Sequence, residues 1–265
     1  MTLEPAVGDP MVEYRNLWKA FDHPVLSGVD LAVGRGETLA VVGHSGTGKS
    51  VLLKTTIGLI VPDRGDVVVE GESVFRGGRK ALERVRRKAG YVFQNSALFD
   101  SMSVYENVSQ GLSDQEIRAL GPREVLRRVS EALEHVNLDA AKVMGKLPSE
   151  LSGGMRKRVG VARAIVGRPE ILLYDEPVTG LDPVNGTVVH RLIAQLASEL
   201  GITSIIVTHD IEGALPISDR VALLDHGRIR FVGTAGEFRA SDDVLVRAFL
   251  ERDVPHAELL EAEAV

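Results

Sequence analysis

The chain has 265 residues, of which 44% are hydrophobic and 26% charged, and its formal net charge is -6. This size and balance predict one large globular domain, alone or with a subdomain, and the acidic total gives no support for a nucleic-acid partner. The absence of cysteine excludes disulfides and thiol catalysis. We expect neither a secretory signal at residues 1–10 nor an apolar run near the roughly 20 residues that span a bilayer, so another chain would supply any membrane span.

The first elements predicted are two strands, Val12–Trp18 and Val25–Val33, around a turn at residues 22–24. Phe21 lies at that turn. An aromatic side chain there could belong to the core, or it could offer its face to a nucleotide base, a contact worth about 0.5–1.5 kcal/mol.

The next stretch fits the phosphate-binding pattern G-x-x-x-x-G-K-[ST]. Its residues are Gly43, His44, Ser45, Gly46, Thr47, Gly48, Lys49 and Ser50. A buried strand is predicted before it, over 37–42, and a helix after it, over 49–59. Glycines let backbone N–H groups approach a phosphate at the positive end of a helix, where Lys49 can reach the terminal phosphates and Ser50 can bind Mg²⁺. A glycine-rich turn before an ordinary helix is the alternative, and the strand–loop–helix context disfavours it.

Short strands follow, first at Val67–Glu70 and then in a hairpin region at 71–78, which suggests an antiparallel sheet packed on the parallel one. Residues 80–88 predict a basic, exposed helix. The apolar run Gly90–Phe93 then stops at Gln94. In open α/β sheets such a strand end lies at the carboxyl edge, where ligands bind.

From Asn95 to about Val166 the apolar spacing becomes helical, so we expect a mainly helical insertion between two core strands. Within it, Ser152 is a plausible N-cap, and Gly153 and Gly154 leave backbone N–H groups free at a positive helix end. The helix after them carries four basic residues. They indicate either a solvated basic face or an anion site, and the members are Arg156, Lys157, Arg158 and Arg163.

The apolar run 170–174 ends in Asp175 and Glu176. Two adjacent carboxylates after a buried strand are costly unless they bind a cation or do chemistry. A turn at 180–183 containing Asp182 leads into a helix over 184–200, and the β-branched strand 202–207 ends at Thr208 and His209. A lone histidine at a strand end is usually structural, but here it is the third strand to end in a polar residue, which indicates a phosphate contact.

The chain closes with a predicted hairpin, Val221–Leu224 and Arg228–Val232, and with helices between 235 and 252. Residues 255–265 are acidic and rich in alanine and leucine. They predict either a helical partner-binding tail or a disordered one.

In this order the motifs resemble the nucleotide-binding subunit of an ATP-binding cassette (ABC) transporter. The resemblance implies an α/β fold of the P-loop NTPase ABC type: a mixed-sheet core, an antiparallel β-subdomain and an inserted helical subdomain. It places the ATPase domain at 11–252, with the helical part at about 95–166 inside a RecA-like core, and a tail at 253–265. ATP and Mg²⁺ are the implied cofactors.

The resemblance also assigns residue roles. Phe21 takes the place of the aromatic that stacks on adenine, Gly43–Ser50 with Val51 bind ATP, and Gln94 is the Q-loop glutamine. Mg²⁺ would be held by Ser50, Gln94 and Asp175, and catalysis would fall to Glu176, His209 and Lys49. ATP would be bound in trans by Ser152, Gly153, Gly154 and Asp182. Residues Leu151–Met155 resemble the family signature. Two departures stand out: Met155 ends this signature where glutamine is usual, and Val51 stands where threonine is common.

Residues 93–108 and 147–165 further resemble the ATPase of Mla-type systems, which move phospholipids between the membranes of double-membraned bacteria. The resemblance implies a homodimer, an integral membrane permease, a lipid-shuttle substrate-binding protein and a small accessory subunit. It places the chain at the cytoplasmic face of the inner membrane, with Leu98, Phe99 and Met102 in the permease groove. An importer ATPase for an amino acid or a metal is the first alternative. The second is a non-transport ABC protein serving ribosomes, DNA repair or cluster assembly.

Overall fold

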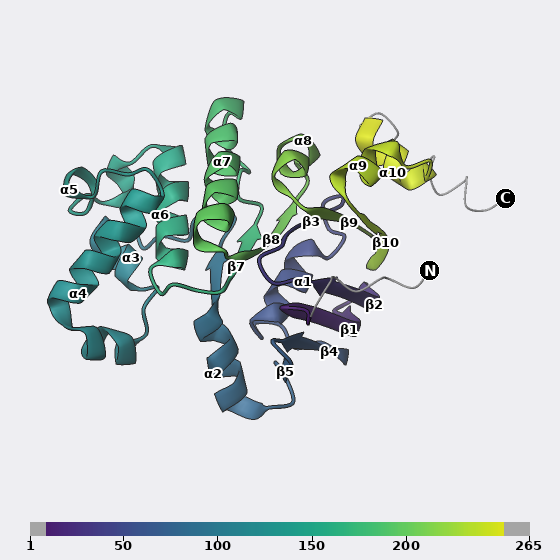
Figure 1. Ribbon diagram of the computed structural model, residues 1–265, viewed down its shortest axis with the longest axis horizontal. Coiled ribbons are helices and arrows are strands. Elements are labelled where there is room, and N and C mark those ends of the chain that lie inside the picture. Colours follow the sequence, from purple (N-terminus) through teal and green to yellow (C-terminus); the bar gives the residue numbers. More distant parts are fainter. Residues whose placement is uncertain (1–8, 252–265) are drawn as a thin grey trace.

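The computed structural model describes residues 9–251, and its centre is a six-stranded sheet in the order β10-β9-β3-β8-β7-β6 (Figure 1). All neighbouring strands are parallel except β10, which is antiparallel to β9. The strands are β3 (Thr38–Val42), β6 (Ala89–Val92), β7 (Ile171–Asp175), β8 (Thr203–Thr208), β9 (Arg220–Asp225) and β10 (Arg228–Gly233).

The three central strands, β3, β7 and β8, are buried along their whole length. Their near-continuous aliphatic sequences suit a parallel sheet that is covered on both faces. Parallel pairing sets Val42 beside Thr208 and Asp175 beside Val207. The carboxyl ends of the three strands therefore meet at one edge of the sheet.

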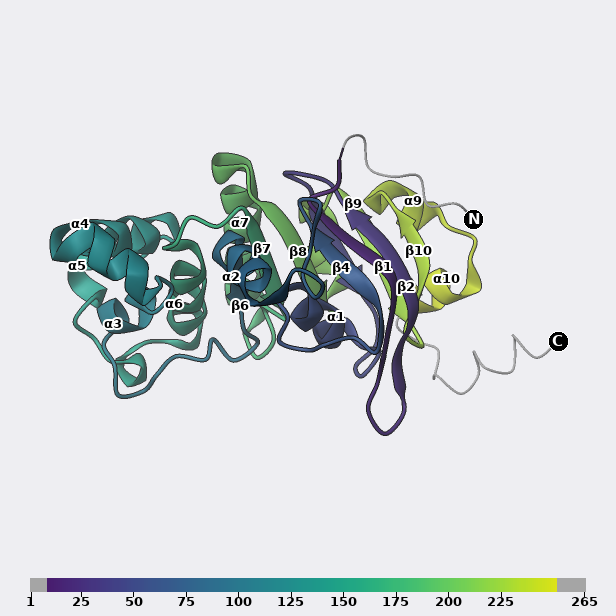
Figure 2. The ribbon, with the colours of Figure 1, turned by 90° about the horizontal axis from the view of Figure 1, so that it is seen from below.

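A second, antiparallel sheet has the order β2-β1-β4-β5 and contributes to the same hydrophobic cluster as the core strands. Its strands are β1 (Val12–Ala20), β2 (Pro24–Val33), β4 (Arg64–Val69) and β5 (Glu72–Ser73). The buried Tyr14 hydroxyl joins this sheet to helix α1 (Lys49–Thr56) through a 2.7 Å hydrogen bond with Thr56 Oγ1. The tip of the β1–β2 hairpin projects beyond the rest of the sheet (Figure 2).

Helices gather on one side of the molecule between β6 and β7, after the basic helix α2 (Gly78–Lys88) (Figure 1). They are α3 (Val104–Ser109), α4 (Asp114–His135), α5 (Ala140–Val143), the 3-10 turn η1 (Pro148–Glu150) and α6 (Gly153–Ile165). Helix α4 begins at Asp114, because Ser113 and Glu116 form a capping box there. Gly121, at φ 74°, bends the helix just before Pro122.

The remaining helices are α7 (Pro183–Leu200), α8 (Ile211–Ala214), η2 (Leu215–Ile217), α9 (Ala235–Ala240) and α10 (Val244–Glu251). Mixed core sheet, antiparallel sheet and helical region together confirm the predicted fold class. The predicted tail, 255–265, lies outside the described residues. Within residues 9–251, no helix is both long and apolar enough to cross a membrane.

Candidate functional site

The loop Gly43–Ser50 connects the carboxyl end of β3 to the first turn of α1. Two of its glycines are required by space and conformation. A Cβ atom on Gly43 would collide with the carbonyl oxygen of Leu224, and Gly48 has φ 101° with Val25 O only 2.8 Å from the place of a Cβ. The loop backbone therefore packs closely against Leu224 and Val25. Its N–H groups lie at the positive end of α1.

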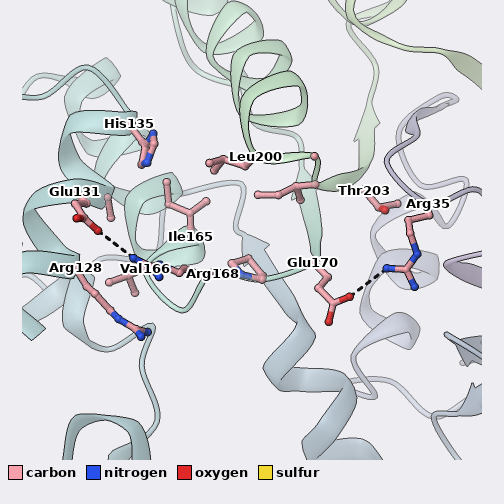
Figure 3. A pocket seen from close by; sticks show the side chains of 14 residues that line it. Arg35, Arg128, Glu131, His135, Ile165, Val166, Arg168, Glu170, Leu200 and Thr203 are labelled. Atoms are coloured by element: carbon pink, nitrogen blue, oxygen red, sulfur yellow. Dashed lines mark hydrogen bonds and ion pairs between the residues drawn. The ribbon is translucent and has the colours of Figure 1, made fainter. Parts of the chain in front are cut away.

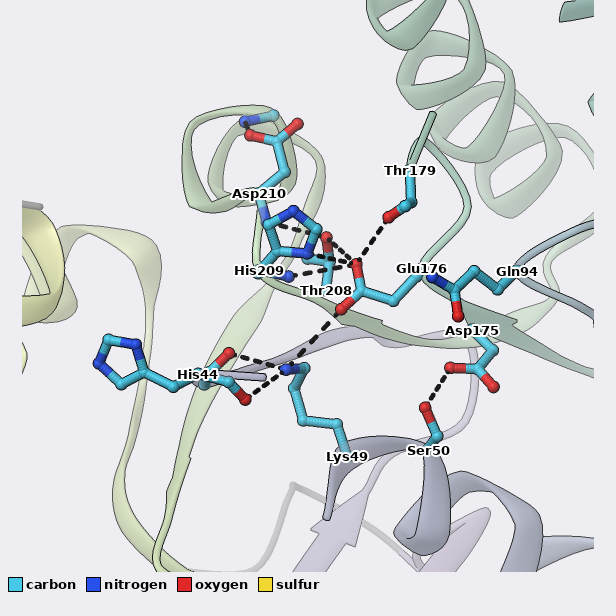
Figure 4. Close-up of polar contacts among 12 residues, drawn as sticks. His44, Lys49, Ser50, Gln94, Asp175, Glu176, Thr179, Thr208, His209 and Asp210 are labelled. Carbon is cyan, nitrogen blue, oxygen red and sulfur yellow. Dashed lines mark hydrogen bonds and ion pairs between the residues drawn. The ribbon is translucent and has the colours of Figure 1, made fainter. Parts of the chain in front are cut away.

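Ser50 and Asp175 meet at the base of this loop (Figure 4). Ser50 Oγ donates to Asp175 Oδ1 at 2.6 Å, and the Tyr91 hydroxyl donates to Asp175 Oδ2 at 2.8 Å. Burial, together with the negative charge of Asp175, raises the pKa of Tyr91, which keeps the phenol protonated as a donor. A hydroxyl and a carboxylate this close are the hard oxygen donors that Mg²⁺ prefers, so these residues fit the ion.

Glu176 is the second buried carboxylate, only 8% exposed, and it faces the end of β8. Its Oε2 lies 2.8 Å from His209 Nδ1 and accepts hydrogen bonds from the hydroxyls of Thr179, at 3.2 Å, and Thr208, at 3.4 Å. The His209 side chain is half exposed. Hydrogen bonds therefore fix Oε2 of the Glu176 carboxylate, while the half-exposed His209 ring borders solvent.

Lys49 completes the group from the opposite side. Its Nζ donates to Gly43 O at 2.7 Å and His44 O at 2.9 Å, and it lies 3.7 Å from Glu176 Oε1. Burial lowers the pKa of Lys49, and the charges of Glu176 and Asp175 oppose that shift. A cation at the helix end therefore lies beside two carboxylates at the carboxyl edge of the sheet.

Gln94 follows β6, and Figure 4 shows its side chain on the Asp175 side of this group. Its backbone carbonyl accepts a hydrogen bond from Lys157 Nζ of α6. Lys157 is therefore not part of a solvated basic face. It fixes the position of the Gln94 loop, and burial lowers its pKa.

The signature residues lie at the start of α6, where Ser152 is the N-cap, as predicted, with Oγ accepting from Met155 N at 3.3 Å. Gly154 packs against Asn185 of α7, and Asp182 caps that helix. In Figure 1 strands β7 and β8 separate α6 from α1. Among the described residues, no hydrogen bond or ion pair joins Ser152, Gly153, Gly154 or Asp182 to the loop Gly43–Ser50.

The other predicted ATP ligands lie at the tip of the β1–β2 hairpin, in the loop itself and at the start of α1. Phe21 is 58% exposed at the hairpin tip, with Lys19 Nζ 5.3 Å from its ring centroid, so it does not belong to the core. Thr47 Oγ1 donates to His44 O at 2.9 Å, and the His44 ring meets Phe249 of α10 edge-on at 4.9 Å. Ser45 and Gly46 are on the exposed side of the loop, and Val51 packs against the core cluster.

A separate hollow of about 520 Å³ opens at the opposite, amino edge of the sheet (Figure 3). Arginines line it, but carboxylates already pair with them: Arg35 with Glu170, and Arg168 with Glu131. These pairs make the hollow a poor match for a triphosphate. The polar group at the carboxyl edge remains the candidate site.

Three residues of this site were missed by sequence reasoning: Tyr91, Thr179 and Thr208. Only their closeness to Gln94, Glu176 and His209 in the chain could have indicated them. A phosphate-binding loop on a helix end, paired Mg²⁺ donors and a second carboxylate at the ends of parallel strands define a P-loop nucleoside triphosphatase.

Comparison with known proteins gives the particular family, because the ABC transporter family matches residues 26–179. Methionine import ATP-binding protein MetN of Caulobacter vibrioides is 39% identical over 86% of this chain and 68% of its own length. Sulfate/thiosulfate import ATP-binding protein CysA of Methylococcus capsulatus is 42% identical, over 85% and 64%. Intermembrane phospholipid transport system ATP-binding protein MlaF of Haemophilus influenzae is 35% identical, over 91% and 90%. The chain belongs to the ABC transporter family and is an ATP-binding, ATP-hydrolysing domain of it.

Solved structures agree. The fold is similar to that of cbiO1 from Clostridium perfringens, part of an ABC transporter complex, with a TM-score of 0.79 and 31% identity over 96% of this chain and all of that one. It is also similar to an ATP-binding cassette captured as a dimer bound to ADP and Pi after hydrolysis, with a TM-score of 0.75 and 30% identity over 85% and 99%. ATP and Mg²⁺ are therefore the cofactors of this domain.

Proposed function

We propose that two copies of this chain clamp ATP between them and drive the transport of a lipid between bacterial membranes. The lipid that we assign is a phospholipid. In each copy the backbone of Gly43–Ser50 cradles the phosphates, and Phe21 stacks on the base. The observation that carries this proposal is the arrangement of two pairs at the carboxyl edge of the sheet: Lys49 Nζ lies 3.7 Å from Glu176 Oε1, and Ser50 Oγ lies 2.6 Å from Asp175 Oδ1.

The chemistry is assigned to the chain's own side chains. Bound Mg²⁺ would neutralise charge on the phosphate oxygens, held by Ser50 and Asp175 with Gln94 beside them. Glu176 accepts the proton of the attacking water, since its Oε1 faces the pocket while hydrogen bonds fix Oε2. Lys49 and His209 stabilise the negative charge that develops on the transferred group.

The second half of each site would come from the other copy. Ser152, Gly153 and Gly154 form a capped helix end, where the first N–H groups of a helix have no intrahelical partner, and Asp182 caps the nearby helix α7. Their separation from the chain's own phosphate loop supports a role in trans. ATP then favours the closed dimer because only that state supplies both sets of contacts.

We place the ATPase domain at residues 11–252, with the helical subdomain at about 95–166 and a tail at 253–265. The helical part would meet a membrane permease at the cytoplasmic face of the inner membrane. The loop before α3 is a suitable contact surface for the permease. The buried Asn107 side chain fixes the shape of this loop by hydrogen bonds with the backbone of Phe99 and Met102. Phe99 is left 52% exposed beside Leu98, an apolar surface suited to a partner.

The phospholipid assignment rests on residues 93–108 and 147–165, including the Met-ended signature, and on the relationship to MlaF. A lipid-shuttle binding protein and a small accessory subunit would complete the system. Import of methionine or sulfate is the second candidate, because MetN and CysA are at least as similar in identity.

The experiment that tests the cargo is purification of the tagged full chain from the membranes of its source bacterium, followed by mass spectrometry of co-purified proteins and lipids. We expect a permease, a lipid-carrying protein and bound phospholipid. The Lys49→Ala variant should keep these partners while losing ATP hydrolysis. An amino-acid- or sulfate-binding protein in place of the lipid carrier would contradict the phospholipid assignment and support the importer.

A further inference from the structure

A buried histidine, His190, lies next to the segment that carries His209 and Asp210. It is on α7, the helix that Asp182 caps, and only 5% of it is exposed. It borders a hollow together with His209 and Asp210. Within the described residues its Nε2 has no hydrogen-bond partner, although Asp210 Oδ2 is 4.0 Å away. An unpaired buried ring nitrogen is costly, so an apolar side chain would be the more favourable choice at this position if packing alone mattered.

Gly213 of α8 makes room for the imidazole. A Cβ atom there would collide with Cε1 and Nδ1 of His190 and would stand 2.8 Å from Asp210 Oδ2. The glycine is not needed for its backbone, because its φ is not positive. Since glycine inside a helix is disfavoured relative to alanine, its presence is best explained by the ring that fills the space.

Asp210 connects His190 to the hydrolytic group in a chain of contacts, part of which Figure 4 shows. Its Oδ1 accepts from Gly213 N at 3.2 Å, and its own N–H donates to Thr208 Oγ1 at 3.0 Å. Thr208 Oγ1 in turn donates to Glu176 Oε2, which also contacts the His209 ring. Movement of residue 210 would therefore displace Thr208 and His209, two of the groups that contact the Glu176 carboxylate.

We propose that His190 is a positioning residue for ATP hydrolysis: its Nε2–H donates to the Asp210 carboxylate and holds residues 208–210 so that His209 and Thr208 stay on Glu176. A shift of about 1 Å brings the two atoms from 4.0 Å to hydrogen-bond distance. Burial lowers the pKa of His190, so the ring is neutral and can donate without adding charge beside the site. This inference rests on the proposed function.

The test measures kcat and KM for ATP, with melting temperatures, on the full chain carrying His190→Leu, His190→Gln or Gly213→Ala. His190→Leu fills the space without a donor, so we expect kcat to fall about tenfold with KM for ATP changed by less than about twofold. His190→Gln keeps an N–H near the Nε2 position and should retain at least about half of kcat. Gly213→Ala should resemble His190→Leu because the ring must move. The matched control is His135→Leu on α4, far from the site, with wild-type kinetics.

Wild-type kcat in His190→Leu, or in Gly213→Ala, would overturn the inference. Equal losses in His190→Leu and His190→Gln that track their melting temperatures would overturn it too, because they would show a purely structural role. These results require an active wild-type chain. A wild-type chain that does not hydrolyse ATP would instead contradict the proposed function, and the two failures are thereby separate.

Discussion

At the scale of single residues, the conformation of Glu176 explains how two consecutive carboxylates serve one pocket. Side chains alternate between the faces of a strand, so Asp175 and Glu176 would point apart in regular β structure. Glu176 instead has φ 49°, in the left-handed region, which costs a residue other than glycine about 1–3 kcal/mol. Its N–H bonds Val207 O at 2.9 Å and its carboxylate accepts from the end of β8. These bonds to β8 offset the strain.

The first prediction concerns the proton-accepting role of that carboxylate. Glu176→Gln keeps the shape and most hydrogen bonds but removes the base, so kcat for ATP should fall at least about 100-fold. ATP affinity should stay near that of the wild type, and nucleotide should hold the dimer together. Turnover assays and size-exclusion chromatography with ATP and Mg²⁺ measure both. Glu199→Gln, exposed on α7, is the control, and normal turnover in Glu176→Gln would contradict the assignment.

The second prediction concerns Tyr91, whose hydroxyl holds the buried Asp175. Tyr91→Phe removes one donor from a buried charge, which should lower the free energy of unfolding by about 1–3 kcal/mol. Tyr174→Phe is a matched control on the neighbouring strand, because the Tyr174 hydroxyl is also buried but lies beside the neutral Ser204 hydroxyl and not beside a carboxylate. Its loss should change stability little or increase it. Urea denaturation of both variants measures the free energy of unfolding. An equal decrease in the two variants would argue against a stabilising contact between Tyr91 and Asp175.

At the scale of elements, helix α6 does more than present the signature. Arg163 donates to Ala97 O at 2.6 Å and Ser96 O at 2.5 Å, and Lys157 donates to Gln94 O. Burial lowers the pKa of both cations. Ser96 and Ala97 both have positive φ, so the loop after β6 is a tight turn whose carbonyls point at α6. One helix therefore carries the signature at its start and holds the Gln94 loop along its side.

The third prediction follows from this double role. Arg163→Ala leaves two carbonyls without their charged donor, so the free energy of unfolding should fall by about 2 kcal/mol. Hydrogen exchange of amides in residues 94–99 should speed up more than in the strands. Arg123→Ala, an exposed arginine on α4, is the control. Unchanged exchange in the loop would mean that α6 does not fix it.

Much of this architecture was predictable from sequence because its signals are local. The phosphate loop, the all-buried strands and the Ser152 cap each depend on a few consecutive residues. Contacts between distant segments could not be predicted in this way. Nothing near Arg163 in the chain indicates that it binds residues 96 and 97, and the basic residues of its helix predicted only a solvated face or an anion site. Pairings such as Tyr91 with Asp175 depend on strand order, which the sequence does not specify.

At the scale of the whole molecule, the polar groups of the predicted site divide into two separate sets. One set surrounds Lys49 and Glu176 at the edge of the sheet, and the other is the start of α6 with Asp182. Strands β7 and β8 stand between α1 and α6 (Figure 1). In the proposed function these sets are two half-sites of one chain, and a two-fold dimer in which each copy faces the other would complete both at once.

The last prediction tests that completion. Ser152→Arg places a long cation where the other copy's γ-phosphate would be capped, so it should abolish the ATP-dependent dimer of Glu176→Gln while leaving the ATP affinity of the monomer close to normal. Ser149→Arg, an exposed serine three residues earlier, carries the same added charge and should leave the dimer intact. Analytical ultracentrifugation with ATP and Mg²⁺ separates the two cases. A dimer that survives Ser152→Arg would show that the start of α6 does not face nucleotide, because a bulky guanidinium cannot fit where a hydroxyl and bare backbone N–H groups contact phosphate.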